Sequence, residues 1–260
     1  MKYNKIILFF AISLVFSTLM RYFQIGYTVE FETGFFKTGF ENVGYFIMGA
    51  IFVSALLTAI FSKTAYKKPD GVPKNKILGV VSAIPAIAVL IEILADSQII
   101  YINPIQIILL KITGLMTAVY FILFGLSQFI ELKIPSITSI IPAVYIIIRI
   151  ICDFTAISSL ALISDNIFLI GFYCLILLFM LNFAKLYVGM GGDGIFRKLL
   201  ALGLSSSIIG ISQAVPFIII NAITQNGYNH ITNSENFSIL GFSIFAIVFV
   251  FTYFSRENVE

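Results

Sequence analysis

Residues 237–254 read FSILGFSIFAIVFVFTYF, an apolar run without a charged side chain. As a helix, a run of about 18 residues or more crosses a hydrocarbon core of about 30 Å. Seven further apolar runs of comparable length precede it. The eight predicted spans are 6–28, 43–62, 77–95, 105–129, 137–157, 166–186, 199–223 and 237–254. The sequence therefore predicts an all-α, polytopic integral membrane protein with about eight transmembrane helices.

The composition of the 260 residues excludes an ordinary soluble domain. Hydrophobic residues make up 59% and charged residues 11%, with a mean hydropathy of +1.02, whereas about 25% of the residues of soluble domains are charged. The stretches between the spans are too short for a sizeable soluble domain, so the predicted environment is the lipid bilayer. The net charge of +3 gives no indication of nucleic-acid binding. A chain rich in Ile, Phe, Asn and Lys is typical of an AT-rich bacterial genome, which predicts the plasma (inner) membrane of a bacterium.

Basic residues gather on one side of the predicted membrane. Because eight crossings return the chain to its starting side, both termini share that side. Only Lys37 lies in a loop on the opposite side. Cytoplasmic loops concentrate Lys and Arg, so we predict that both termini are cytoplasmic. The twelve basic residues on the side of the termini are Lys2, Lys5, Lys63, Lys67, Lys68, Lys74, Lys76, Lys133, Lys185, Arg197, Lys198 and Arg256.

The second half of the chain matches the first at several polar positions. The simplest account is a tandem duplication of a four-helix unit, 1–134 and 135–260, with both copies in the same orientation and packed into one compact membrane domain. The alternative is that topology alone places basic residues at inner helix ends and acidic residues at outer ends. The matched positions are Glu41 with Asp165, Asp70 with Asp193, Lys76 with Lys198 and Arg21 with Arg149.

Ionisable side chains inside the predicted helices are the candidates for a functional site. A charge at the centre of a membrane helix costs about 2.5 to 3.5 kcal/mol on insertion scales, so such residues face a protein interior or a wet cavity. Arg21 and Arg149 lie deepest and occupy corresponding places in the two units. We expect an outward-facing polar cavity that binds substrate. Its predicted residues are Arg21, Arg149, Asp153, Glu92, Lys111 and Gln213.

The spacing of these residues suggests how their charges pair. Arg149 and Asp153 are separated by four positions and share a helix face. Glu92 and Lys111 are level on neighbouring helices and are predicted partners, whereas Arg21 has no acidic partner in this prediction. Alternatively, Arg149 and Asp153 only fix helix register, and Glu92 and Lys111 reach the head groups. Two arginines suit a carboxylate or phosphate group, so the predicted solute is small and anionic.

Motifs for catalysis, metal binding and nucleotide hydrolysis are missing from the sequence. His230 is the only histidine, and no GxxxxGK[ST] motif occurs. Cys152 and Cys174 lie in apolar stretches and are interpreted as buried hydrophobic residues. We therefore expect no cofactor, no metal ion and no catalytic residue.

These features leave two classes of function. The first is a small-solute permease, or the substrate-binding membrane subunit of a larger transporter, with an outward-facing polar cavity. The alternative is a non-transporting membrane sensor or scaffold whose basic cytoplasmic loops bind a protein partner. A membrane-embedded enzyme is a third and weaker hypothesis. A cavity that joins Arg21 to Arg149 would favour the first class, and an interior filled by side chains would favour the second.

Overall fold

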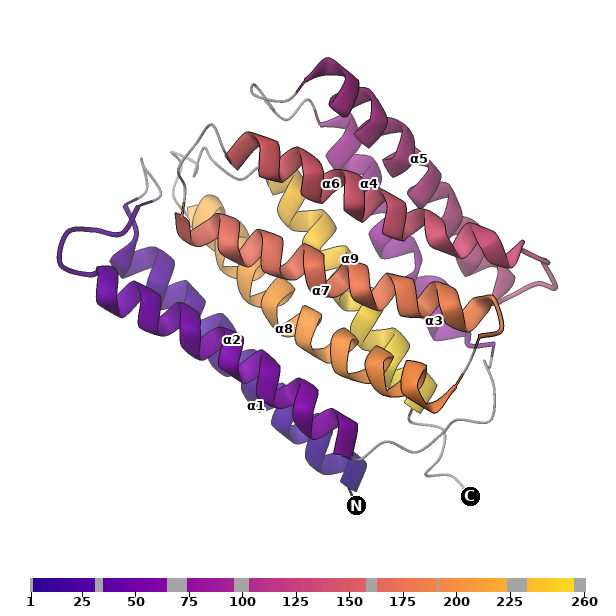
Figure 1. The fold of residues 1–260 in the computed structure, drawn as a ribbon, viewed down its shortest axis with the longest axis horizontal. Coiled ribbons are helices and arrows are strands. Elements are labelled where there is room, and N and C mark those ends of the chain that lie inside the picture. The colour runs from indigo at the N-terminus through magenta and orange to yellow at the C-terminus, as the bar shows by residue number, and fades with distance from the viewer. Residues whose placement is uncertain are drawn as a thin grey trace.

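The backbone is helical almost throughout the computed structural model. The structure describes residues 2–30, 35–64, 74–95, 103–157, 163–190, 192–223 and 233–254. Within these ranges the only β-type pairing is a single antiparallel bridge between Val29 and Phe36. Eight helices are long and apolar enough to cross a membrane (Figure 1). The prediction of an all-helical chain with eight helices able to cross a membrane is confirmed for the described residues.

The eight spans consist of nine α-helices and two short helical segments in the described part of the chain. The third and fifth spans are each built from two pieces, and the first ends in a π-helical turn, η1. The elements are α1 (Lys2–Phe23), η1 (Gln24–Thr28), α2 (Glu41–Thr64), α3 (Lys76–Val81), α4 (Ala83–Leu94), α5 (Pro104–Ser127), η2 (Ser136–Ile140), α6 (Ile141–Ile157), α7 (Ile163–Tyr187), α8 (Asp193–Ile223) and α9 (Asn233–Phe254).

Proline explains the break between α3 and α4. Pro85 has no backbone N–H and cannot bond the carbonyl of Val81, which is the last residue of α3. The chain turns at Ser82, whose hydroxyl donates to the carbonyl of Gly79 at 2.8 Å. The predicted third span is therefore a membrane crossing with a local kink.

Helix α8 lies in the middle of the bundle. It packs against α1, α2, α7 and α9, while α9 also packs against α4, and α4, α5 and α6 follow one another on the far side. Figure 1 shows α1 and α2 side by side along one edge and α4 to α6 along the other. Phe183 and Phe245 are fully buried and lie edge to face with ring centroids 5.8 Å apart. Buried aromatic side chains thus pack between the central helices α7 and α9.

Glycine permits the closest approach between α3 and α5. A Cβ atom on Gly125 would lie 2.8 Å from the carbonyl oxygen of Gly79 and would also collide with the Ser82 hydroxyl. Membrane helices gain no hydrophobic drive from contact with each other, because lipid is equally apolar. Small residues that bring two backbones together therefore stabilise this pair through van der Waals contact.

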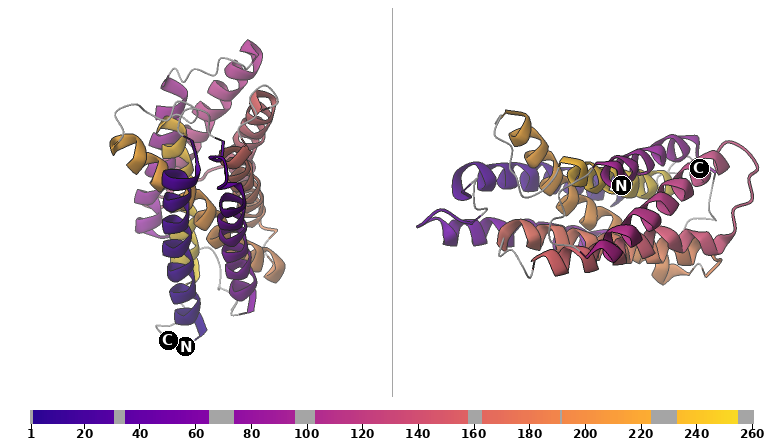
Figure 2. Two further views of the ribbon diagram at one scale, coloured as in Figure 1. Left: turned by 90° about the vertical axis from the view of Figure 1, so that its left-hand side faces the viewer. Right: turned by 90° about the horizontal axis from the view of Figure 1, so that it is seen from above.

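The chain enters and leaves the bundle at one end. The start of α1 and the end of α9 lie at the same end of the bundle in Figure 1 and in the left view of Figure 2, as eight crossings require. Helix α8 packs against α1 and α2, whereas α4, its counterpart in the predicted duplication, makes its main contacts with α5 and α9. Asp70, one of the matched loop residues, and His230 lie outside the described residues. The tandem repeat stays a prediction.

Candidate functional site

Arg149 of α6 lies among three carboxylates that come from three different helices. Its Nη1 is 2.6 Å from Glu92 Oε1 of α4, and its Nη2 is 2.5 Å from Glu235 Oε1 of α9. Its Nε is 3.1 Å from Asp153 Oδ1, one turn further along α6. All four residues are buried. We call these four residues the Arg149 network.

Local helix geometry orients the Arg149 network. Residues four apart on a helix share a face, which brings Asp153 beside Arg149. Tyr145, one turn before Arg149 on the same helix, donates its hydroxyl to Glu92 Oε2 at 3.0 Å. Glu92 therefore receives a hydrogen bond on each carboxylate oxygen, and its side chain is held toward α6. Glu235 enters from the first turn of α9, where a helix N-terminus stabilises an acidic side chain.

Arg21 of α1 forms a second polar cluster with α7 and α8. Its Nη2 donates to Asp165 Oδ1 at 2.5 Å, and Gln213 Oε1 accepts from Nη2 at 2.9 Å and from Nε at 3.2 Å. Its Nη1 donates to Gln24 Oε1 at 2.5 Å. The Arg21 side chain is fully buried, with 0% of its surface exposed. We call Arg21, Gln24, Asp165 and Gln213 the Arg21 cluster.

Aromatic rings and a π-helical turn enclose the Arg21 cluster. The guanidinium carbon lies 4.0 Å from the centroid of the Phe168 ring and 5.8 Å from that of Phe217. Such contacts stabilise a cation in a water-poor interior. Gln24 begins the π-helical turn η1, and its Nε2 donates to the carbonyl of Gly44 on α2 at 2.7 Å. Wide turns of this kind are frequent at functional sites in helices.

The two clusters differ in charge. Arg21 and Asp165 bring one positive and one negative formal charge, so their pair is neutral. The Arg149 network brings three carboxylates against one guanidinium, which leaves two formal negative charges in excess. In a low-dielectric interior an uncompensated charge is costly, so this imbalance is the main chemical feature of the site.

Two further buried polar atoms lie near these clusters. The Tyr173 hydroxyl of α7 and Gln213 Nε2 of α8 have no hydrogen-bond partner in the described part of the chain. Tyr173 is 1% exposed, and its hydroxyl is within electrostatic range of all four members of the Arg149 network. Asp165 and Tyr173 lie eight positions apart on α7, or about 12 Å along the helix axis. Helix α7 therefore supplies Asp165 to the Arg21 cluster and places the Tyr173 hydroxyl near the Arg149 network.

The structure brings together most of the residues predicted for the site, in two groups. Arg149 and Asp153 form the predicted pair, and Gln213 joins Arg21. Glu92 contacts Arg149 rather than Lys111, whose side chain on α5 is exposed. The exposure of Lys111 agrees with the alternative that it reaches the head groups.

Sequence reasoning placed Asp165 and Glu235 in loops and missed both as partners of the arginines. Each lies in the first turn of a helix that begins earlier than predicted, α7 at Ile163 and α9 at Asn233. The expectation that Arg21 lacks an acidic partner is therefore corrected. One available signal was the acid-asparagine pair that opens both apolar runs at 165–166 and 235–236.

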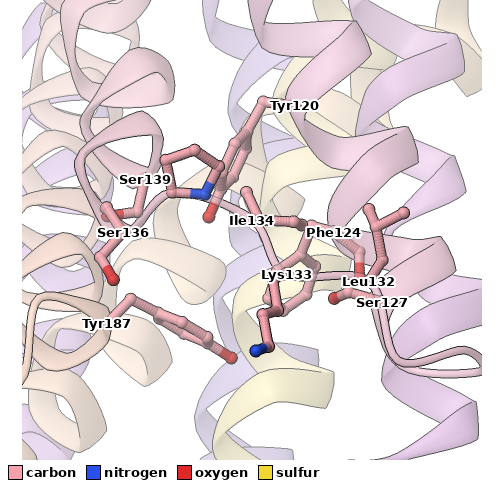
Figure 3. A pocket seen from close by; sticks show the side chains of 10 residues that line it. Tyr120, Phe124, Ser127, Leu132, Lys133, Ile134, Ser136, Ser139 and Tyr187 are labelled. Atoms are coloured by element: carbon pink, nitrogen blue, oxygen red, sulfur yellow. Dashed lines mark hydrogen bonds between the residues drawn. The ribbon is translucent and has the colours of Figure 1, made fainter.

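A cavity of about 290 Å³ lies at the other end of the bundle (Figure 3). It is formed by the end of α5, the segment that leads into η2 and the end of α7. The Lys133 ammonium and the hydroxyls of Tyr120 and Tyr187 give it a polar side, and Phe124 and Leu132 line its apolar side. Asp165 at the start of α7 and Tyr187 at its end are separated by the length of that helix. This cavity is thus remote from both arginine clusters.

No family model, curated protein or solved structure gives a significant match to this chain. Among the described residues, no three His, Cys, Asp or Glu side chains are arranged to hold a metal ion. The fold defines the class of protein: an α-helical protein with eight helices able to span a membrane. Its distinguishing feature is the pair of buried charge clusters between those helices.

Proposed function

We propose that this chain is a small-solute permease, or the substrate-binding membrane subunit of a transporter, in the inner membrane of a bacterium. The observation that carries the proposal is the Arg149 network, in which α4, α6 and α9 each place a carboxylate against one guanidinium. Ionisable residues between membrane helices are costly and mark pathways for ions and solutes. The contacts of Arg149 with α4 and α9 depend on charge. They would change if a solute or a proton replaced Arg149 as the partner of one carboxylate.

The charge balance bears on the class of solute. An anion, the class that two arginines suggest, would have to displace a carboxylate from a guanidinium, because Arg21 contacts Asp165 and Arg149 contacts three acids. The excess of carboxylates favours a neutral or cationic solute instead. If the termini are cytoplasmic, both clusters lie toward the outer face of the membrane. If the four-plus-four repeat holds, α1 and the η2–α6 span are equivalent elements of the transporter.

Thermal stabilisation of the purified protein by small solutes tests the proposal. A panel of cationic, neutral and anionic metabolites would be screened against the wild type and the Asp153→Asn variant. Asp193→Asn is the matched control, because Asp193 is exposed in the first turn of α8. We expect a solute that stabilises the wild type and Asp193→Asn but loses its effect on Asp153→Asn. Equal stabilisation of all three proteins by every active solute would exclude the Arg149 network as the binding site.

A sensor or scaffold function is the second candidate, and the cavity near Lys133 favours it. With cytoplasmic termini this cavity lies at the cytoplasmic surface, where a partner protein could reach it. Arg21 and Arg149 are also enclosed by side chains, at 0% and 5% exposure. Lys133→Glu would distinguish the two functions, since it would disrupt partner binding in a sensor and leave solute stabilisation of a permease intact.

A further inference from the structure

We propose that the Arg149 network is a proton-binding site and that Asp153 carries the exchangeable proton. The proposal deepens the permease function, because a proton held between α4, α6 and α9 is a candidate coupling ion. Its starting point is the charge count, three carboxylates against one guanidinium in a buried cluster.

The groups that face the network come from four helices. Helix α4 contributes Glu92, α7 contributes the Tyr173 hydroxyl and α9 contributes Glu235, while α6 supplies the remaining groups. The Lys111 side chain of the adjacent α5 is exposed. The α6 groups are Tyr145, Arg149, Cys152 and Asp153.

Among the described residues of the network, the carboxylates exceed the guanidinium by two negative charges, and uptake of a cation offsets such an excess. Ionisable groups in an apolar interior neutralise when no partner compensates their charge. A bound metal ion is disfavoured, because the described carboxylates are not arranged to hold one and each points at the guanidinium instead. A proton needs no coordination shell, so it is the cation that carboxylates already held against one guanidinium can take up.

Tyr173 is an independent observation that points to the same ligand. Its hydroxyl is 1% exposed, has no hydrogen-bond partner among the described residues and lies within electrostatic range of Arg149, Glu92, Glu235 and Asp153. A buried hydroxyl without a partner is costly. A phenol hydroxyl can accept a hydrogen bond from a protonated carboxyl or donate one to a carboxylate, so a network acid that moved within reach of Tyr173 would satisfy it in either protonation state.

The contact distances select Asp153 among the three acids. A guanidinium stabilises the ionised form of a carboxylate more strongly the closer its nitrogens lie. Glu92 and Glu235 lie 2.6 and 2.5 Å from terminal guanidinium nitrogens, and Glu92 also accepts from Tyr145. Asp153 contacts only the side nitrogen Nε, at 3.1 and 3.2 Å from its two oxygens. It therefore receives the least compensation for a negative charge.

Infrared spectroscopy of the purified protein at neutral pH tests the proton directly. A protonated carboxyl has a carbonyl stretch that is separate from carboxylate and amide bands and shifts in D₂O. We expect such a band in the wild type, a clear loss of its intensity in Asp153→Asn and a displaced band in Asp153→Glu. Asp193→Asn, which removes an exposed acid, should leave the band unchanged. Absence of the band from the wild type would overturn the proton site, and unchanged intensity in Asp153→Asn would overturn its assignment to Asp153.

The spectrum separates this inference from the permease function. It requires no solute, so a band that behaves as expected establishes the proton site even if no solute in the panel stabilises the protein. That combination would refute the proposed transport function and would leave the proton site intact. A solute response that depends on Asp153, without any protonated-carboxyl band, would retain the binding site and reject the proton.

Discussion

Removing the Arg21 guanidinium should destabilise the protein strongly, although methionine fills a similar volume. Arg21→Met takes away the nitrogen that lies 2.5 Å from Asp165 Oδ1 and both N–H groups that donate to Gln213 Oε1. Asp165 is 2% exposed, so water cannot replace the lost contact without a rearrangement. Breaking a buried ion pair by removing one partner costs about 3 to 5 kcal/mol. We expect a loss of that size in the free energy of unfolding.

A second substitution should recover part of this loss. In Arg21→Met/Asp165→Asn the stranded carboxylate is replaced by a neutral amide of the same shape. The remaining cost is that of unsatisfied buried polar groups, about 1 to 3 kcal/mol. The double variant should thus be about 2 kcal/mol more stable than Arg21→Met, within the range measured for coupled neighbours.

Equilibrium unfolding in mixed detergent and SDS micelles provides the measurement. The four proteins compared are the wild type, Arg21→Met, Asp165→Asn and Arg21→Met/Asp165→Asn. Lys185→Met is the control for loss of a basic side chain, because Lys185 is exposed near the other end of α7. Its stability should stay within about 0.5 kcal/mol of the wild type. Additive effects of the two single substitutions would show that Arg21 and Asp165 do not interact, and the assignment of a buried pair would be wrong.

Three further predictions follow from the same structure. Arg149→Met should destabilise the protein by more than the about 3 to 5 kcal/mol expected for Arg21→Met, because three buried acidic side chains lose the partner that they share; a smaller shift in the same SDS titration would contradict the network. Gly125→Ala should cost about 1 to 3 kcal/mol, since its Cβ would lie 2.8 Å from the Gly79 carbonyl oxygen. Gly49→Ala on α2 meets nothing within 4 Å and should stabilise by up to about 1 kcal/mol, and equal thermal shifts of the two variants would refute the close approach of α3 and α5. In a background with Cys152→Ala and Cys174→Ala, a membrane-impermeant thiol reagent should label Thr38→Cys in intact cells and leave Asn75→Cys protected; the opposite pattern would invert the predicted topology.

The number of membrane helices could be predicted from the sequence because length and apolarity alone determine a crossing. The residues at which the helices begin and end could be predicted less well. The predicted seventh span begins at residue 199, whereas α8 begins at Asp193 and continues for 31 residues. Polar residues can form the first turn of a membrane helix when they face lipid head groups or other parts of the protein. Composition alone does not distinguish such residues from the residues of a loop.

The partners of the buried charges could be predicted only within one helix. The Arg149–Asp153 contact follows from a four-residue spacing, which helix geometry fixes. The contact between Glu92 and Arg149 depends on which faces of α4 and α6 point inward. In a membrane bundle the lipid-facing side is as apolar as the core, so hydrophobic periodicity does not mark the inner face. Proximity in sequence therefore favoured Lys111 as the partner of Glu92, and tertiary packing selected Arg149.

The two arginines that the sequence pattern treats as equivalent have different physical roles. Arg21 contacts one acid, two amide oxygens and two aromatic rings, and its pair with Asp165 carries no excess charge. Such a contact joins α1, α7 and α8 without an added proton or cation. Arg149 contacts more acids than it can neutralise, so the attraction between α4, α6 and α9 depends on how many protons or cations the network holds. If the chain moves during a functional cycle, we expect the α4–α6–α9 contact to change and the α1–α7–α8 contact to persist.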